Sequence, residues 1–159
     1  KGKLIANCFM IGLLLNIASN AIMLVYTTQV LKINLFADWA GSLLLMLLGN
    51  VFGIAAGLLI GTNQKLTMQG RIIFALISNL VLSALAGMMG TAMKGFANTF
   101  MPGFNQFNPV ALMVTGFYQL NRLVGSADLS RTYLLLGIYT LALIGCALWR
   151  LRRTRYDSL

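Results

Sequence analysis

Asparagine supplies the side chains best placed for chemistry inside the apolar parts of this chain. Asn16 and Asn20 lie four residues apart in one long apolar run, and Asn50 lies near the middle of the next run. A helix places the first two on one face. Amides at this depth either hydrogen-bond between helices or line a polar route, and the sequence leaves both interpretations open. Because Asn16 and Asn50 lie at similar depth, we predict a hydrogen bond between them if their helices approach closely.

Glycine recurs at every fourth position of the second apolar run, at Gly49, Gly53, Gly57 and Gly61. Positions four apart share one face of a helix, and a face without side chains lets another backbone approach closely in lipid. In water each of these glycines would cost about 1 kcal/mol relative to alanine. The spacing therefore predicts a membrane helix with a close-packing face, although glycine is also common in membrane helices for other reasons.

Methionine is concentrated near the end of the third apolar run and beyond it, at Met88, Met89, Met93 and Met101. Its flexible, polarizable side chain usually fills irregular gaps between packed elements. The same adaptability suits a tolerant exit for apolar molecules. The sequence is compatible with both roles.

The composition excludes most catalytic chemistry. The sequence has no histidine and no glutamate, and its two cysteines, Cys8 and Cys146, lie far apart. Histidine-dependent nucleophiles and histidine-based zinc sites are therefore excluded. The sequence also lacks the Gly-Lys-Ser or Gly-Lys-Thr ending of a P-loop, so it cannot bind ATP in that way. We expect no enzyme activity, no cofactor and no metal, and any energy for transport has to come from a partner or from a missing part of the protein.

Long apolar runs dominate the composition, with 58% hydrophobic and only 9% charged residues. A soluble domain averages about 25% charged residues. We therefore predict an all-α integral membrane protein with a single transmembrane domain over residues 1–159. Apolar runs of about 20 residues can cross a bilayer. Such runs predict four spans, at about residues 4–28, 40–62, 72–93 and 132–150.

The segment from about residue 94 to residue 131 is apolar but too interrupted to cross the membrane simply. Asn108 and Pro109 form a helix-start signal, with Asn as the N-cap and Pro at the first helical position. A helix from Val110 to Val124 should follow, and its polar residues argue against a full span. We predict a re-entrant or interfacial helical segment before the last span.

Basic residues fall unequally on the two sides of the four predicted spans. One side, which carries both termini, holds Lys1, Lys3, Lys65, Arg71, Arg150, Arg152, Arg153 and Arg155. The other side holds Lys32, Lys94, Arg122 and Arg131. Because cytoplasmic loops carry the excess of Lys and Arg, we predict a cell-membrane protein with both termini in the cytoplasm. The charges are scattered between apolar runs, which does not favour nucleic acid as a partner.

The basic residues after the last span form a cluster of their own: Arg150, Arg152, Arg153 and Arg155. Such a cluster is expected to anchor the last helix on anionic membrane lipid. Contact with a cytoplasmic partner is the alternative interpretation.

The order of these features resembles a known family. Three spans, an outer segment with Pro102 and the Asn108-Pro109 pair, and a last span ending in Arg-Arg-Thr-Arg-Tyr-Asp-Ser-Leu resemble an ABC transporter permease of the type-two exporter class. The match is to the carboxy-terminal four-span portion of its transmembrane domain. The first two spans of such a permease would precede Lys1, so we expect the chain to be part of a longer permease.

This resemblance implies several properties that cannot be inferred from the composition. It implies short re-entrant helices in the outer segment and a dimer with a second permease copy or a homologue. It also implies that a cytoplasmic ABC ATPase subunit hydrolyses the ATP. The exported molecule would be a drug, peptide, lipid or glycan.

Two other classes of protein remain as alternatives. One is a small four-span membrane protein with a structural or assembly role. The other is a fragment of a secondary carrier. Proton-coupled carriers usually keep an ionisable residue within the membrane, whereas Asp38, Asp128 and Asp157 all fall outside the predicted spans.

Overall fold

The structure, a computed structural model, describes residues 2–32, 36–122 and 127–153. Within these residues every regular element is helical. The elements are α1 (Gly2–Val25), a π-helical turn η1 (Tyr26–Val30), α2 (Trp39–Gly61), α3 (Met68–Leu85), α4 (Thr91–Phe100), α5 (Phe104–Phe107), α6 (Pro109–Arg122) and α7 (Ala127–Arg153).

Four of these helical segments are long and apolar enough to cross a membrane: Ala6–Val30, Trp39–Gly61, Met68–Leu85 and Leu129–Arg150. The prediction of an all-α, multi-pass membrane protein is therefore confirmed. The first and last helices are longer than predicted, because the π-helical turn extends the first to Val30 and α7 begins before residue 132.

The third helix is shorter than predicted, and its C-terminus explains why. Gly87 has a φ of 94°, a left-handed conformation that favours glycine. The N–H of Gly87 donates to the carbonyl of Ala84 (3.0 Å), and the N–H of Met88 donates to that of Ser83 (3.1 Å). This pair of bonds is a Schellman motif, which ends a helix. The helix stops at Leu85, so the predicted end at residue 93 was wrong.

Side-chain caps begin three of the helices. Asp38 and Thr67 accept hydrogen bonds from the N–H groups of Gly41 and Gly70, each at 3.2 Å. Asn108 accepts one from the N–H of Val110 at 3.0 Å. The predicted helix start at Asn108 and Pro109 is therefore confirmed, and α6 is described as far as Arg122. The predicted end at Val124 lies outside the described residues.

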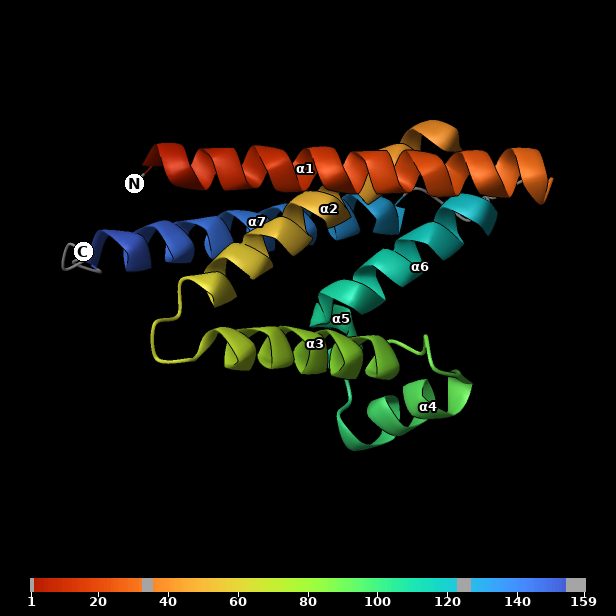
Figure 1. Ribbon diagram of the computed structural model, residues 1–159. Helices are drawn as coiled ribbons and strands as arrows, with labels where there is room; N and C mark the ends of the chain where they lie inside the picture. Colours follow the sequence, from red (N-terminus) through yellow and green to blue (C-terminus); the bar gives the residue numbers. More distant parts are fainter. Residues whose placement is uncertain (1, 33–35, 123–126, 154–159) are drawn as a thin grey trace.

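The predicted re-entrant or interfacial segment between α3 and α7, called the re-entrant segment below, is helical and folds back on itself. Figure 1 shows α4 running inward from the end where α1 is joined to α2. The short α5 lies part-way along the length of the molecule, and α6 runs back out to the end where α7 begins. The segment thus starts and finishes at the same end of the molecule.

The packed centre of the fold is a junction between α2, α6 and α7. Leu45 and Leu136 are fully buried there, together with Leu120. Glycine makes the close approach possible, because a Cβ added at Gly116 would lie 2.8 Å from Cδ2 of Leu45. The hydroxyl of Tyr133 donates to the carbonyl of Gly41 at 3.1 Å and ties α7 to α2.

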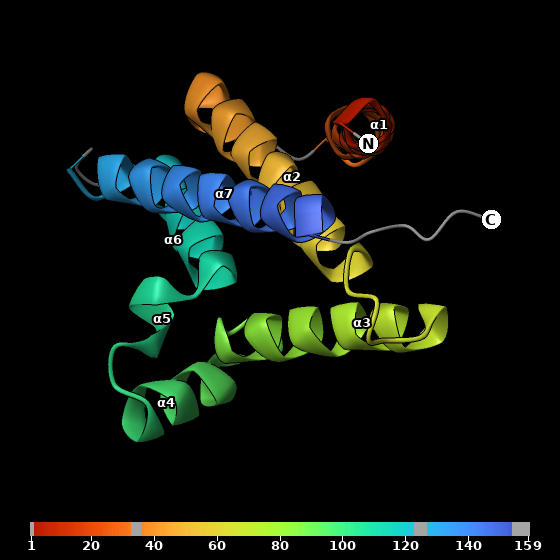
Figure 2. The same ribbon diagram turned by 90° about the vertical axis from the view of Figure 1, so that its left-hand side faces the viewer.

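The other two spans lie outside this junction. Figures 1 and 2 both place α1 and α3 on opposite sides of α2 and α7. The turn between α2 and α3 is fixed by Arg71, whose guanidinium donates to the carbonyls of Gly61 (2.9 Å) and Leu66 (3.1 Å). A cation on the last carbonyls of a helix stabilises its C-terminus.

Candidate functional site

A cleft of about 620 Å³ lies between α1, α2 and α6. Among the described residues, its lining contains amides, methionines and phenylalanines and no charged side chain: Asn20, Met23, Phe36, Met46, Asn50, Met88, Met113, Phe117 and Asn121. Sites for small molecules typically measure about 300–1,000 Å³ and combine a mostly apolar lining with a few polar groups. This amide–methionine cleft has that character.

The amide pair in the cleft joins the first two spans. Nδ2 of Asn20 donates to Oδ1 of Asn50 at 3.1 Å. The predicted bond between Asn16 and Asn50 is therefore wrong. Asn16 instead donates to the carbonyl of Gly12 in its own helix, at 3.0 Å, and its side chain is exposed. The crossing of α1 and α2 brings Asn50 opposite the asparagine one turn further along α1.

The amide pair keeps further hydrogen-bonding capacity. A neutral amide has two N–H donors and an oxygen that accepts twice. Among the described residues, no hydrogen bond engages Oδ1 of Asn20 or Nδ2 of Asn50. Both side chains are half-buried and line the cleft. Within apolar surroundings, such groups favour a bound molecule that can both donate and accept.

A second wall of the cleft is built by α6 and the residues just before α2. Oδ1 of Asn121 accepts from the backbone N–H of Ala37 at 3.0 Å. Phe36 stacks on Phe117 with ring centroids 6.0 Å apart, and it meets Trp39 edge-on at 5.3 Å. These contacts hold the re-entrant helix against the start of the second span.

Methionine reaches the cleft where glycine leaves space. A Cβ added at Gly49 would overlap the terminal methyl of Met113, whose sulfur would lie 3.0 Å away. The missing side chain at Gly49 thus admits Met113 of α6 into the space beside α2. Because methionine adapts its shape readily, this wall can fit apolar groups of differing outline.

The remainder of the predicted glycine face is not packed within the described part of the chain. A Cβ added at Gly53, Gly57 or Gly61 would meet no atom within 4 Å. Gly49 itself receives a side chain rather than the expected helix backbone. Close packing of another helix on Gly53, Gly57 and Gly61 stays a prediction.

Other predicted residues are distributed around the molecule. Of the methionine cluster, Met88 lines the cleft, whereas Met89, Met93 and Met101 are exposed elsewhere. In the basic cluster, Arg150 donates to Oδ1 of Asn63 at 3.5 Å. Arg152 and Arg153 lie within α7, and Arg155 lies outside the described residues.

Sequence reasoning missed a set of amides that fix the re-entrant segment. Asn108 is only 2% exposed, and its Nδ2 donates to the carbonyl of Leu82 at 2.9 Å. Nδ2 of Asn105 donates to the carbonyl of Leu85 at 3.0 Å. The last turn of α3 therefore holds α5 and the start of α6. The signal in the sequence was the presence of Asn105 and Asn108 close to helix-breaking residues. We interpreted Asn108 only as the N-cap of α6.

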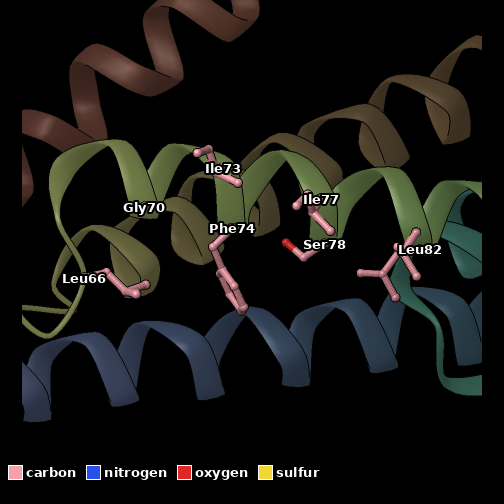
Figure 3. A pocket seen from close by; sticks show the side chains of 8 residues that line it. Leu66, Gly70, Ile73, Phe74, Ile77, Ser78 and Leu82 are labelled. Atoms are coloured by element: carbon pink, nitrogen blue, oxygen red, sulfur yellow. The ribbon is translucent and has the colours of Figure 1, made fainter.

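A second groove, of about 540 Å³, follows α3 and is almost wholly apolar. In the view of Figure 3, the side chain of Phe74 extends from α3 in the direction of α7. The polar side chain in this groove, Ser78, donates to the carbonyl of Ala75 in its own helix at 3.1 Å. The groove therefore offers little that could select one molecule over another, and the amide–methionine cleft is the better candidate site.

Comparison of the chain with protein-family models, with curated proteins and with solved structures finds no match. The functional argument therefore depends on the geometry of the cleft and on the sequence features already described.

Proposed function

We propose that this chain is the membrane-spanning permease part of an ATP-driven ABC exporter. It would move a drug, peptide, lipid or glycan out of the cell. The observation that carries the proposal is the amide–methionine cleft, because it joins two spans to a re-entrant helix and combines adaptable apolar walls with amides. A cargo passing between the spans needs such a surface.

The lining restricts the kind of cargo. The part of the lining that the structure describes has no charged side chain, so an ion would lose its hydration there without gaining an opposite charge. The amides of Asn20 and Asn50 can instead satisfy hydroxyl, carbonyl or amide groups. We therefore assign to the cleft a neutral molecule, or the neutral part of a larger one, with an apolar body.

The proposal includes partners. A cytoplasmic ABC ATPase subunit would supply the energy, because the sequence holds no P-loop, and a second permease copy or a homologue would complete the pathway. The unequal distribution of Lys and Arg supports a cell-membrane location with both termini in the cytoplasm.

The test of the proposal is purification of the natural full-length protein in mild detergent. We expect an ABC ATPase subunit to copurify in stoichiometric amount, and the complex to hydrolyse ATP after reconstitution into liposomes. Leu45→Trp would disrupt the packed junction and is a poor probe, whereas Met23→Trp fills the cleft from an exposed position on α1. The Met23→Trp complex should still assemble with its ATPase but lose export. Purification without any ATPase would contradict the proposal and favour the small four-span protein.

Topology is tested separately by cysteine labelling. In a variant with Cys8 and Cys146 replaced by alanine, a cysteine at Ser130 should react with an impermeant reagent added to intact cells. A cysteine at Gln64, in the α2–α3 turn, should react only after the cells are opened. Both positions are exposed. The opposite pattern of labelling would reverse the orientation.

A further inference from the structure

A smaller and more polar cavity, of about 260 Å³, lies where α5, α6 and α7 meet. Its lining is Asn105, Gln106, Leu112, Thr115, Gln119, Arg131 and Thr132. None of these residues lines the amide–methionine cleft. We call this cavity the Arg131 pocket, because Arg131 is the one charged residue among the described residues that line it.

The electrostatics of this pocket favour an anion. Arg131 is exposed, and among the described residues no hydrogen bond or ion pair engages its guanidinium. It lies five residues into α7, which begins at Ala127. The N-terminal end of a helix is electropositive and attracts anions. The guanidinium of Arg131 and the N-terminal end of α7 therefore both attract an anion into the pocket.

The surface below Arg131 is apolar and exposed. Leu134, Ile138 and Leu141 follow at helical spacing on the same face of α7, with exposed fractions of 65%, 58% and 72%. Arg131 and Arg150 lie about 28 Å apart along the helix axis, close to the roughly 30 Å thickness of the hydrocarbon core. Arg131 thus lies at headgroup level, at the end of an apolar stripe.

We propose that the Arg131 pocket binds the phosphate group of a phospholipid whose acyl chain lies along this stripe. A guanidinium binds phosphate oxygens in a paired, charge-assisted geometry. The exposed amide of Gln106 and hydroxyl of Thr115 add donors from α5 and α6. The volume is below the range of about 300–1,000 Å³ typical of whole-ligand sites, and so suits a headgroup. The proposal does not depend on the transport function.

Binding is tested on the purified full chain in neutral detergent, by native mass spectrometry with three probes. These are short-chain phosphatidic acid, diacylglycerol with the same chains, and inorganic phosphate. We expect phosphatidic acid to bind at least tenfold more tightly than either of the others. Arg131→Gln should weaken its binding about tenfold, the effect of losing a charge-assisted bond. Lys94→Gln removes an exposed charge outside the pocket and should have no effect.

Two further variants separate a built site from general attraction to basic protein. Thr115→Val keeps the net charge and the shape of the side chain, so only a specific site should lose affinity, by about threefold. Arg131→Lys keeps the charge but not the paired donors, and should weaken binding as well. Equal effects of Arg131→Gln and Lys94→Gln, or no effect of Thr115→Val and Arg131→Lys, would overturn the proposal. Equally tight binding of inorganic phosphate would overturn the assignment to lipid. Circular dichroism of each variant confirms that the helices are intact.

Discussion

The α2–α6–α7 junction and α3 are both strongly apolar, yet they differ in what covers them. At the junction Leu45 and Leu136 are 0% exposed. Along α3 the side chains of Ile73, Phe74 and Leu76 are all more than half exposed. Hydropathy places both regions in the membrane but does not show which of them is packed and which is exposed. The difference lies in small residues such as Gly41 and Gly116, which let helices approach closely only at the junction.

The amide–methionine cleft lies at the border between packed and open regions. Its α6 wall belongs to the junction, since Phe117 and Met113 pack against the buried leucines. Its α1 wall does not, because α1 packs mainly on α2, and no residue of its apolar span Ala6–Val30 is buried. One wall is thus fixed and the other is lightly held. A change in the position of α1 would therefore widen the cleft without disturbing the core.

The largest effect should come from filling the junction. Gly116→Leu would force side-chain atoms into Leu45, and we expect a loss of about 3 kcal/mol in the free energy of unfolding. Gly137→Leu is the matched control, because a Cβ there meets no atom within 4 Å. Its effect should be within about 0.5 kcal/mol. Denaturant unfolding in detergent micelles measures both. Equal stabilities of the two variants would show that the junction is not the packed core.

The second-largest loss of stability should come from changing Asn108, the amide that joins the re-entrant segment to α3. Asn108→Ala removes both the cap of α6 and the bond to the carbonyl of Leu82, and should cost about 2 kcal/mol. Asn108→Ser keeps an oxygen for the cap but loses the amide donors, so it should cost about half as much. If the serine variant is as unstable as the alanine variant, the cap contributes nothing, and the link to α3 accounts for the whole effect.

A smaller effect should distinguish the two ends of the glycine face. Gly49→Leu displaces Met113 and should destabilise the single chain by about 1 kcal/mol or more. Gly53→Leu meets open space within the described chain, so the stability of the single chain should not fall. If a second permease copy packs on this face, Gly53→Leu should still reduce the fraction of crosslinked dimer. An unchanged fraction of crosslinked dimer would show that Gly53 is not part of a close-packing face.

Much of the fold could be predicted because it depends on local signals. Apolar run length identified the four spans, and the Asn108-Pro109 pair identified the start of α6. The end of α3 had a local signal too, since Gly87 follows the last helical turn and takes a positive φ. It was missed because the apolar run continues beyond it. Hydrophobicity reports preference for lipid, whereas a Schellman motif depends on the backbone of two or three residues.

The candidate site was less predictable because it depends on how the helices cross. Asn20 and Asn50 were recognised as intramembrane amides, but Asn121, Met113 and Phe36 of the same cleft were not. Those residues come from α6 and the segment before α2, and their depth depends on the path of the re-entrant segment. Sequence spacing also placed Asn16 and Asn20 on one face without showing which of them meets α2.

The smallest predicted effect tests whether Asn20, rather than Asn16, bonds to α2 at the α1 wall of the cleft. Asn20→Leu and Asn50→Leu each leave one amide without its partner, whereas the double variant leaves no orphan. The double change should therefore cost less than the sum of the single changes, by about 0.6–1.7 kcal/mol, the range for interhelical bonds in membranes. Asn16→Leu should show no such coupling with Asn50→Leu, because Asn16 bonds to its own helix. Additive effects for Asn20 and Asn50 would mean that α1 is held by apolar contacts alone. If Asn20 and Asn50 are coupled and the Asn20→Leu variant also shows altered export, the amide pair has two roles. It holds α1 against α2, and it contacts the cargo.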